Sequence, residues 1–493
     1  MIWLLVVAAL AAAVPAGLRW LRVAQREHYL PPAASRFALR WWGLGASNFL
    51  LAVIALVGLF GSLTSPAFGL LAALAQVGPL GLSIRGRTSE LAWTERLKRV
   101  GGVAGALYVA IVALGAVLDL AFLIALAIIA VPLIVDLSLA VLAPIERRLG
   151  DRWVEKAASR LESSDVRVVA ITGSFGKTST KQYVHHLLSP SVRTVASPAS
   201  FNNRMGLARA INEHLVAGTE VFIAEMGTYG VGEIADLCSW IEPEVASIVS
   251  IGPVHLERFG SVETIVAAKS EILDRAKKGV LSIDHPLLAK LADDREDSLE
   301  LTRVSASGAQ ADVTVEDGFV LASGDQLGRV PDGVFPTNLA IAVAIVRALG
   351  EEVDPELFET LPRAEHRQSV TTSERGFTII DDTFNSNPAG ASLALSRLAE
   401  APGKKVLVTP GMVELGELQD TENESFARSA STVCDRIVIV GATNRKALLR
   451  GAESGSASVT VVDTREAAVA LIRDQLGEGD AVLYENDLPD HYP

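Results

Sequence analysis

The sequence predicts an α-helical membrane region followed by α/β domains. Residues 1–150 contain long uncharged apolar runs and carry a net charge of +6. The rest of the chain carries a net charge of −19 and alternates short β-rich runs with helical stretches. Long apolar runs are typical of membrane helices, and strand–helix alternation is typical of a doubly wound parallel sheet. From the length of 493 residues we expect three domains, at 1–150, 151–352 and 353–493.

The apolar runs predict about five membrane spans. Residues 1–18 carry no charged side chain, and 41–84 form an uncharged run long enough for two spans of about 20 residues each. Residues 100–145 are interrupted only by Asp119 and Asp136 and fit two more spans. The first span could also be read as a cleaved signal peptide, but it lacks a basic start, which favours an uncleaved anchor. We interpret Asp136 as lying near the cytoplasmic end of its span rather than as a functional carboxylate within the membrane.

Basic residues predict the orientation of these spans. Five arginines lie within 19–40, five basic residues lie within 85–99, and Arg147 and Arg148 follow the last span. With five spans all three clusters fall on one side, which the positive-inside rule makes cytoplasmic. We therefore expect a multi-pass protein of the bacterial inner membrane, in contact with lipid, with its remaining domains in the cytoplasm. The acidic second part has no basic tract, so nucleic acid is not an expected partner.

A phosphate-binding loop is predicted within residues 166–180, VRVVAITGSFGKTST. The apolar run before it reads as a buried strand, and the residues after it open a helix, so backbone N–H groups and a helix N-terminus point at one place. Because Ile171 stands where the full Walker pattern requires glycine, the match is a shorter G-x-x-G-K-T, and an ordinary glycine turn is the alternative. The candidate nucleotide ligands are Gly173, Ser174, Gly176, Lys177, Thr178 and Ser179, with Thr178 also a ligand for Mg²⁺.

Further candidates follow the strands expected at 192–195, 221–224 and 246–251. In doubly wound sheets ligands bind beyond the carboxyl ends of the strands. Glu225 follows one strand directly and is well placed to bind Mg²⁺ beside the phosphates. His255 follows the next strand, and Lys269 lies on the helix after it; on the residues alone, a loop histidine bonded to backbone and a solvated lysine are the simpler interpretations.

A second, Rossmann-like α/β unit begins after residue 361. A strand at 377–380 ends in Asp381 and Asp382, and Asn385 and Asn387 follow before the next helix. Strands at 406–408, 437–440, 459–462 and 481–484 alternate with helices. The acidic and amide side chains at this strand-to-helix turn indicate either a ribose contact or caps of the helix that follows.

Several separated segments resemble the motifs of one family, the Mur ligases, and most closely its MurF type. The resemblance covers roughly residues 165 to 485 and is carried, in order, by ITGSFGKTSTK, SFNNRMGLA, AEMGTYGVGEI, HLERFGSVETIVAAKSEIL, NLAIAVAIVRALG, DDTFNSNPAGASLAL and MVELG. It implies a P-loop ATPase domain, a C-terminal domain that closes on it, and an ATP-dependent carboxylate–amine ligase that works through an acyl phosphate.

The resemblance also implies roles for the candidate residues. Lys177 would hold the β- and γ-phosphates of ATP, and Thr178, Glu225 and His255 would contribute to Mg²⁺ sites, two in number. Lys269 matches the lysine that is carbamylated in the family and faces the second Mg²⁺. The other implied contacts are adenine for Asn338, the phosphates for Arg367, the ribose and the closing domain for Asp381, Asn385 and Asn387, and the acceptor substrate for Asn202 and Asn203.

Three departures from the family pattern bear on the substrate. No counterpart of the family's UDP-sugar-binding domain is recognisable, and membrane segments stand in its place. Phe384 replaces a tyrosine, and Tyr484-Glu485-Asn486 replaces Lys-Gly-Ser. We expect addition of D-Ala-D-Ala or a related amine to a muramoyl-peptide wall precursor, with a lipid-linked acceptor. Two alternatives remain open: a ligase or amidating enzyme of another polymer or of lipid-linked peptidoglycan, and a non-catalytic, nucleotide-binding scaffold for wall enzymes.

Overall fold

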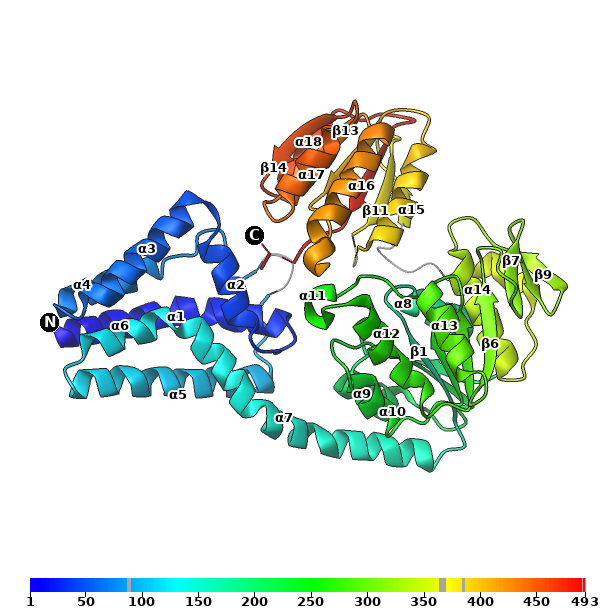
Figure 1. The fold of residues 1–493 in the computed structure, drawn as a ribbon, viewed down its shortest axis with the longest axis horizontal. Coiled ribbons are helices and arrows are strands. Elements are labelled where there is room, and N and C mark those ends of the chain that lie inside the picture. Colours follow the sequence, from blue (N-terminus) through cyan, green and yellow to red (C-terminus); the bar gives the residue numbers. More distant parts are fainter. Residues whose placement is uncertain (87–89, 363–368, 384–385, 490, 493) are drawn as a thin grey trace. The chain divides into compact units, whose positions relative to one another are not determined.

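The computed structural model describes residues 1–86, 90–362, 369–383, 386–489 and 491–492 (Figure 1). It separates into two compact units. The first unit combines Met1–Leu149 with Leu488–Pro493, and the second is Gly150–Asp487. The first unit is therefore built from both ends of the sequence.

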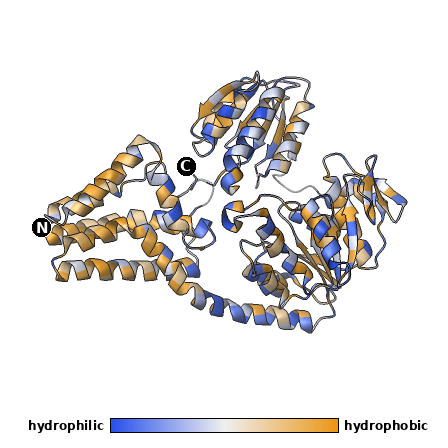
Figure 2. Ribbon diagram, in the orientation of Figure 1, coloured by the Kyte–Doolittle hydropathy of each residue, from blue (hydrophilic) through white to orange (hydrophobic). Residues whose placement is uncertain are grey.

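The first unit is helical, and its helices are predominantly apolar (Figure 2). Two of them, α1 and α5, are long and apolar enough to cross a membrane, and the bent pairs α2–α3 and α6–α7 raise the number to at most four in the described residues. The five expected spans are not confirmed, because α4 has only 10 residues. At 1.5 Å per residue it covers about half of a 30 Å hydrocarbon core. The helices are α1 Ile2–Arg26, α2 Ala33–Trp42, α3 Gly45–Gly61, α4 Pro66–Ala75, α5 Glu95–Val117, α6 Ala121–Ile129 and α7 Val131–Glu162, which continues into the second unit.

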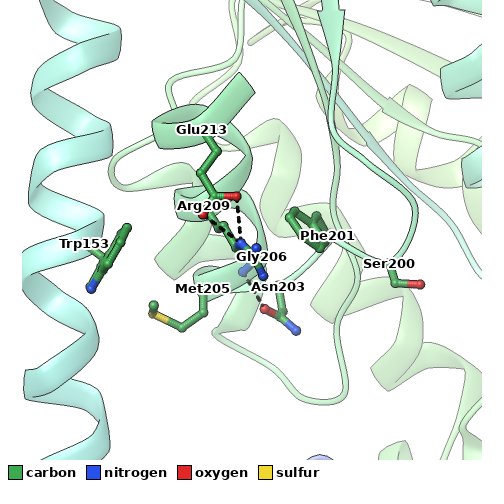
Figure 3. Close-up of a pocket in the computed structure, with 8 residues that line it drawn as sticks. All are labelled: Trp153, Ser200, Phe201, Asn203, Met205, Gly206, Arg209 and Glu213. Atoms are coloured by element: carbon green, nitrogen blue, oxygen red, sulfur yellow. Dashed lines mark hydrogen bonds and ion pairs between the residues drawn. The ribbon is translucent and has the colours of Figure 1, made fainter. Parts of the chain in front are cut away.

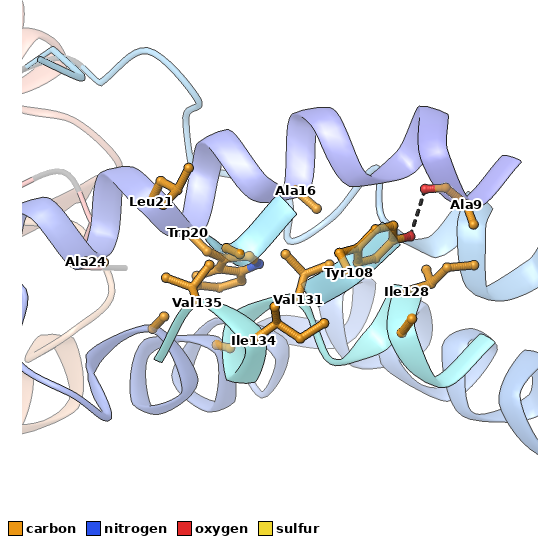
Figure 4. Close-up of a cluster of buried hydrophobic side chains, with 14 of the residues drawn as sticks. Ala9, Ala16, Trp20, Leu21, Ala24, Tyr108, Ile128, Val131, Ile134 and Val135 are labelled. Carbon is orange, nitrogen blue, oxygen red and sulfur yellow. Dashed lines mark hydrogen bonds between the residues drawn. The ribbon is translucent and has the colours of Figure 1, made fainter. Parts of the chain in front are cut away.

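Small residues and large aromatic residues pack the core of this unit. Ala9 and Ala16 of α1 are fully buried, and Trp20 of the same helix packs with α7 residues such as Val131 (Figure 4). The hydroxyl of Tyr108 on α5 donates a hydrogen bond to the Ala9 carbonyl oxygen at 2.8 Å. Small side chains allow helices without water between them to approach closely, which is how apolar helices associate in lipid.

Arg19 donates hydrogen bonds to carbonyl oxygens of the irregular segment that follows α4. Its guanidinium donates to the carbonyl oxygens of Leu82 at 3.1 Å and of Val77 at 3.3 Å, and it also contacts that of Gly78 at 2.5 Å. The side chain is 6 % exposed. Non-helical backbone is tolerated at membrane depth only where protein groups satisfy its carbonyl oxygens. A charged residue near the end of an apolar helix therefore has a structural role here.

Asp136 on α7 also has a structural role. Its carboxylate accepts hydrogen bonds from the backbone N–H groups of Ala34 at 3.0 Å and Ser35 at 2.8 Å, at the start of α2. These are N–H groups that a helix leaves without an internal partner, and an anion stabilises them. Asp136 thus holds the start of α2, and its position near the cytoplasmic end of a span stays a prediction.

The last residues of the chain pack into the first unit. His491 is buried, and its Nε2 lies 3.0 Å from Oε1 of Glu27, while the Trp41 indole N–H donates to the His491 carbonyl oxygen at 2.7 Å. The rings of His491 and Tyr492 both meet Phe37 edge to face. The segment after Asp487 is thus an integral part of this unit.

The second unit contains two mixed sheets. In the larger, β1 to β7 pair in parallel in the order β2-β3-β1-β4-β5-β6-β7. Strands β8 and β9 then extend the sheet with antiparallel pairing. The parallel part was expected, but the antiparallel hairpins were not. Helices α8 and α14 pack on one face, and α9, α10, α12 and α13 pack on the other. The strands are β1 Arg167–Thr172, β2 Thr194–Ala196, β3 Val221–Glu225, β4 Val245–Ile248, β5 Lys278–Ser282, β6 Glu300–Ser305, β7 Val313–Glu316, β8 Phe319–Ala322 and β9 Asp325–Arg329.

Helices follow most strands of this sheet along the chain and pack on its two faces. They are α8 Lys177–Leu188, α9 Arg204–His214, α10 Glu233–Cys238, α11 Leu256–Phe259, α12 Val262–Ser270, the 3-10 turn Glu271–Leu273, α13 Pro286–Arg295, α14 Pro336–Ala348 and the 3-10 turn Pro355–Thr360. Every residue of α14 from Asn338 to Val346 is buried. Such a helix, apolar all round, belongs in the interior of an α/β domain.

The smaller sheet has the order β10-β11-β15-β12-β13-β14, with only the edge strand β10 antiparallel. Two buried clusters, one on each face, hold its helices in place. The elements are β10 Ser369–Thr372, β11 Thr378–Asp382, α15 Pro388–Ala399, β12 Lys405–Thr409, the 3-10 turn Gly416–Leu418, α16 Gln419–Val433, β13 Arg436–Val440, α17 Arg445–Ala452, β14 Ser458–Val462, α18 Arg465–Arg473 and β15 Ala481–Glu485.

Replacement of Arg19 tests its role in the first unit. Arg19→Ala leaves several buried carbonyl oxygens without a donor, so we expect a loss of unfolding free energy on the order of 3 kcal/mol. Thermal unfolding of the detergent-solubilised protein measures the effect. The exposed Arg148→Ala is the matched control and should change the melting temperature little; equal melting temperatures for both variants would contradict the assignment.

Candidate active site

Hydrogen bonds with the chain after β4 fix the loop between β1 and α8. The Ser174 hydroxyl accepts from the Gly252 N–H at 3.0 Å and donates to the Gly252 carbonyl oxygen at 3.1 Å. The Phe175 N–H donates to the Ser250 hydroxyl at 2.9 Å. These bonds fix the loop so that α8 begins at Lys177 with its first N–H groups directed at the loop.

Gly176 is required in this loop on two counts. Its φ of +81° lies in the left-handed region, and an added Cβ would lie 2.5 Å from the Asn338 side-chain oxygen. Asn338, at the start of α14, is itself buried. The structure therefore places Asn338 directly against the phosphate loop.

The first turn of α8 carries the predicted ligands Lys177, Thr178 and Ser179. The Lys177 ammonium group donates to the Gly173 carbonyl oxygen at 2.6 Å, and the Thr178 hydroxyl donates to Oε2 of Glu225 at 3.0 Å. Lys177 is thus folded back onto its own loop, where a phosphate oxygen is the stronger competing acceptor.

Glu225 is the buried centre of the site. Its side chain lies at the end of β3, and Oε2 is 3.0 Å from Nζ of Lys181. The Asn202 amide donates to Oε1 at 3.1 Å. Burial raises the pKa of the Glu225 carboxyl, but the charges of Lys181 and Lys177 outweigh it and hold that pKa below its ordinary value. The carboxylate is therefore ionised and available to a cation.

The sequence did not reveal Lys181. It lies four residues after Lys177, one helical turn further along the same face of α8, and is 3 % exposed. A buried lysine requires a negative partner, and Glu225 supplies it. The i, i+4 spacing from the loop lysine was the signal that could have identified it.

Lys269 lies on α12 and approaches the same loop from another side. Its Nζ donates to the Gly173 carbonyl oxygen at 3.2 Å, and it is 4 % exposed. Burial, together with the charge of Lys177, lowers the pKa of the Lys269 amine well below its ordinary value. Two lysines thus meet at one carbonyl oxygen, and burial and the charge of Lys177 both favour the uncharged form of the Lys269 amine.

His255 contacts Glu414 and Tyr229. Its backbone is left-handed, with φ of +57°, and Nδ1 is hydrogen-bonded to a carboxylate oxygen of Glu414. Its ring also meets that of Tyr229 edge to face, with centroids 5.0 Å apart. The sequence did not mark Glu414 individually, although it lies in the MVELG segment. This pair joins the loop after β4 to the loop after β12.

The asparagines of the SFNN segment have different positions. Asn202 binds Glu225, as described above, whereas Asn203 caps α9 by accepting from the Gly206 N–H at 2.9 Å. Asn203 also lines an open cavity of about 540 Å³ beside α9 (Figure 3). Asn202 therefore contacts the buried Glu225 carboxylate, and its neighbour Asn203 lines a cavity.

The candidates in the smaller sheet form local contacts. Asp381 accepts from the N–H and hydroxyl of Thr383, at 3.2 and 2.6 Å, and Asn387 caps α15 by accepting from the Gly390 N–H at 3.1 Å. The capping interpretation of Asn387 is thus realised in its geometry. Arg367 and Asn385 lie outside the described residues.

The donor set fits a magnesium ion bound together with phosphate. Within the described residues no group of three or more His, Cys, Asp or Glu side chains is placed to hold a metal. Thr178 and Glu225 nevertheless bring a hydroxyl and a carboxylate oxygen within 3.0 Å of each other. Mg²⁺ is commonly held by one or two protein oxygens, with phosphates and water completing its octahedron.

Glu485 stands where the family pattern has a different sequence. It ends β15, opposite Asp382 in the adjacent strand, and is fully buried. The hydroxyls of Ser386 and Thr409 both donate to its carboxylate. Burial raises the pKa of Glu485 to about 7, and the charge of Asp382 adds to the rise. The replacement thus brings a second buried acid to the carboxyl end of this sheet.

Gly176→Ala tests the close approach at the loop. The methyl group meets Asn338, and the left-handed backbone adds a cost of about 1–2 kcal/mol, so we expect ADP affinity to fall at least tenfold. Isothermal titration with ADP gives the measurement. Gly477→Ala, where an added Cβ meets nothing and φ is not left-handed, is the control; an unchanged affinity in Gly176→Ala would contradict the geometry.

Glu485→Gln tests the buried acid. Its pKa is about 7 in the folded protein against an ordinary 4.5, so between these values the folded state binds more protons than the unfolded state. The stability of the protein therefore falls as pH rises from about 4.5 to 7. At pH 8 we expect the unfolding free energy of Glu485→Gln to exceed that of the unchanged protein by an amount on the order of 1–3 kcal/mol, so the variant melts at a higher temperature. At pH 5 the two proteins should melt at similar temperatures. A pH-independent difference would count against the shift.

Comparison with known proteins identifies the family. Residues 171–341 match the Mur ligase middle domain, and residues 366–484 match the Mur ligase, glutamate ligase domain. The UDP-N-acetylmuramoyl-tripeptide–D-alanyl-D-alanine ligase of Mycobacterium tuberculosis H37Rv is 33 % identical over 371 residues, covering 66 % of this chain and 71 % of the relative. The enzyme of the same name from Bacillus subtilis is 27 % identical over 350 residues, covering 67 % and 75 %.

Solved structures agree with these relatives. MurF from Acinetobacter baumannii superposes with a TM-score of 0.61 at 25 % identity, covering 69 % of this chain and 77 % of that chain. MurF from Thermotoga maritima in complex with ADP gives a TM-score of 0.58 at 27 % identity, covering 69 % and 80 %. With a glycine-rich loop, Lys177 and the buried Glu225 in the matched region, the chain belongs to the Mur ligase family of ATP-dependent ligases.

Proposed function

We propose that this chain is a membrane-anchored ligase that adds D-alanyl-D-alanine, or a related amine, to a muramoyl peptide of the cell-wall precursor. The observation that carries the proposal is the contact set of Glu225, which joins Thr178, Lys181 and Asn202 beside the Lys177 loop. The name shared by the mycobacterial and Bacillus relatives supports the choice of substrates.

The reaction proceeds in two transfers. A carboxylate oxygen of the acceptor peptide attacks the γ-phosphorus of ATP, and ADP leaves, which converts the poor electrophile into an acyl phosphate. The amine nitrogen then attacks the acyl carbon, inorganic phosphate leaves, and the nitrogen loses a proton. Because an acyl phosphate hydrolyses readily, the site must exclude water during the second transfer.

The residues around the loop orient and neutralise the phosphates. Lys177 exchanges the Gly173 carbonyl oxygen for a phosphate oxygen, and the N–H groups of the loop and of α8 bind the others. Thr178 and Glu225 would hold Mg²⁺, which would neutralise charge on the transferring phosphoryl group. Lys181 keeps Glu225 ionised and in place. His255, held by Glu414, is proposed to contribute to the metal sites, as the family pattern implies.

Lys269 is proposed to carry a carbamate. Its amine is buried and its pKa is lowered, which favours the uncharged form, and that form attacks carbon dioxide with release of a proton. The carbamate would be an anion beside Lys177 and would offer a second Mg²⁺ an oxygen ligand that a lysine cannot provide. The lowered pKa of the Lys269 amine and its contact with Gly173 support this assignment.

The remaining assignments concern the nucleotide and the closing domain. Asn338, which lies against Gly176, is proposed to contact adenine, with Arg367 on the phosphates. Asp381, Asn385 and Asn387 are proposed to meet the ribose from the C-terminal domain. We place the boundary between the central and C-terminal ligase domains at about residue 352, between the two matched regions.

The first unit is proposed to lie in the bacterial inner membrane, with the ligase domains in the cytoplasm. Large apolar side chains on its helices are exposed, for example Trp3 at 70 % and Val117 at 80 %. An apolar surface of this kind requires lipid or a partner. The arginines of α1 and α2, the basic start of α5 and Arg147 and Arg148 supply the positive charge expected on the cytoplasmic side.

We further propose that the acceptor is lipid-linked. The family models match residues 171–341 and 366–484, and neither matched region includes the helical unit. A membrane unit joined to the ligase through α7 suits an acceptor that is itself held in the membrane.

The experiment measures phosphate release by the detergent-purified full chain with ATP, Mg²⁺ and D-alanyl-D-alanine. The two acceptors are UDP-linked and undecaprenyl-linked muramoyl tripeptide, and Lys177→Ala is the blank, expected to lose at least ~100-fold in turnover. Added bicarbonate should restore activity lost at low pH if Lys269 is carbamylated.

Each outcome decides one part of the proposal. Turnover on the lipid-linked acceptor with little on the UDP form supports both parts, and turnover on the UDP form without added lipid rejects the lipid-linked acceptor. A lack of turnover on both acceptors rejects the proposed substrates. Full activity in Lys177→Ala rejects the catalytic role of the loop.

A further inference from the structure

The open cavity beside α9 has a wall that neither matched family region includes. Trp153, from the part of α7 that lies in the second unit, faces Phe201, Met205 and Arg209 across a space of about 540 Å³ (Figure 3). Trp153 precedes residue 171, where the first matched region begins. The cavity is therefore completed by the helix that continues from the apolar unit.

The apolar lining consists of flat or flexible side chains that are accessible. Trp153 is 49 % exposed and Met205 43 % exposed, although both are large apolar residues. Phe201 presents an aromatic ring, and the Arg209 guanidinium lies 5.4 Å from its centroid. Aromatic faces next to a cation and amide groups suit a ligand with an apolar face and a polar edge, such as a sugar ring.

The polar groups of the cavity can change partners at little cost. Arg209 is bonded through Nε to both carboxylate oxygens of Glu213, at 2.8 and 2.9 Å, but the two side chains are 60 % and 40 % exposed. An exposed ion pair of this spacing is worth only about 0.3–0.5 kcal/mol. A phosphate, which arginine binds through two parallel hydrogen bonds, is a stronger partner.

The cavity adjoins the reacting groups. Asn203 lines it, and the preceding residue, Asn202, donates to Glu225. A molecule in the cavity could thus extend along the SFNN segment toward the phosphate loop. The acceptor has such a form, because its reacting carboxylate lies at the far end of a peptide from its sugar and diphosphate.

We propose that this cavity binds the sugar and the adjoining phosphate of a glycosyl-diphosphate acceptor, with Trp153 and Phe201 against the sugar and Arg209 on the phosphate. This inference rests on the proposed function, since it assigns a binding site to the acceptor of that reaction. Sugar and first phosphate are common to the UDP-linked and lipid-linked forms, so the chemistry of recognition is the same for both.

Steady-state kinetics of the full chain test the assignment. We expect Trp153→Ala and Arg209→Gln each to raise KM for the acceptor about tenfold, a change of 1.4 kcal/mol, while kcat and KM for ATP stay unchanged. The matched controls are Trp93→Ala, at a tryptophan 53 % exposed in the first unit, and Arg428→Gln, whose arginine has a similar exposed pair with Glu424 four residues away. Both controls should leave KM for the acceptor unchanged. Trp153→Phe and Arg209→Lys replace any variant that does not fold.

Direct binding separates failure of this inference from failure of the proposed function. Without ATP, the acceptor should change the tryptophan fluorescence of the unchanged chain, and Trp153→Phe should remove that change. Binding of this kind by a chain that shows no turnover would reject the reaction and keep the cavity assignment.

Three results would overturn the inference. One is an active enzyme whose acceptor KM is unaffected by Trp153→Ala and Arg209→Gln. Another is an effect confined to the lipid-linked acceptor, because the cavity would then bind lipid rather than sugar and phosphate. The third is a fluorescence change that persists in Trp153→Phe.

Discussion

The ligase unit depends on one buried charge, the carboxylate of Glu225. At 4 % exposure an ionised side chain is stable only if other groups replace the water it has lost, and Thr178, Lys181 and Asn202 do so. Their bonds bring the start of α8 and the segment before α9 to the end of β3. The carboxylate that organises these three segments is also the group proposed to hold Mg²⁺, so folding and the proposed metal site depend on the same side chain.

Much of the second unit could be predicted from the sequence because its signals are local. The run before Gly173 is continuous and apolar, as expected of a strand buried on both faces, and β1 follows it closely. Thr178 and Glu225 were identifiable for the same reason, each lying immediately after a recognisable strand or loop. The hairpins β7 to β9 were missed because their strands have only four or five residues and are partly exposed.

Other features depend on residues distant in the sequence and could not be read from it. The bond between His255 and Glu414 links positions 159 residues apart, and Glu485 is buried only because strands β11 and β12 flank β15. In the first unit, uniform apolar composition from 41 to 84 hides where one helix stops and the next begins. Helices α3 and α4 are in close contact at Gly58, where a Cβ would lie 2.5 Å from the Ala72 backbone nitrogen. Hydropathy alone does not indicate this contact.

The burial of His491 against Glu27 and Phe37 has a consequence for the order in which the protein is made. A chain emerging from the ribosome presents α1 and α2 first, whereas the residues that complete their packing arrive only after the whole ligase unit has been synthesised. The first unit cannot reach its final packing before that moment. Until then Glu27 has Arg36 as an ionic partner, at 2.8 Å. The carboxylate between α1 and α2 is therefore paired before His491 has been synthesised.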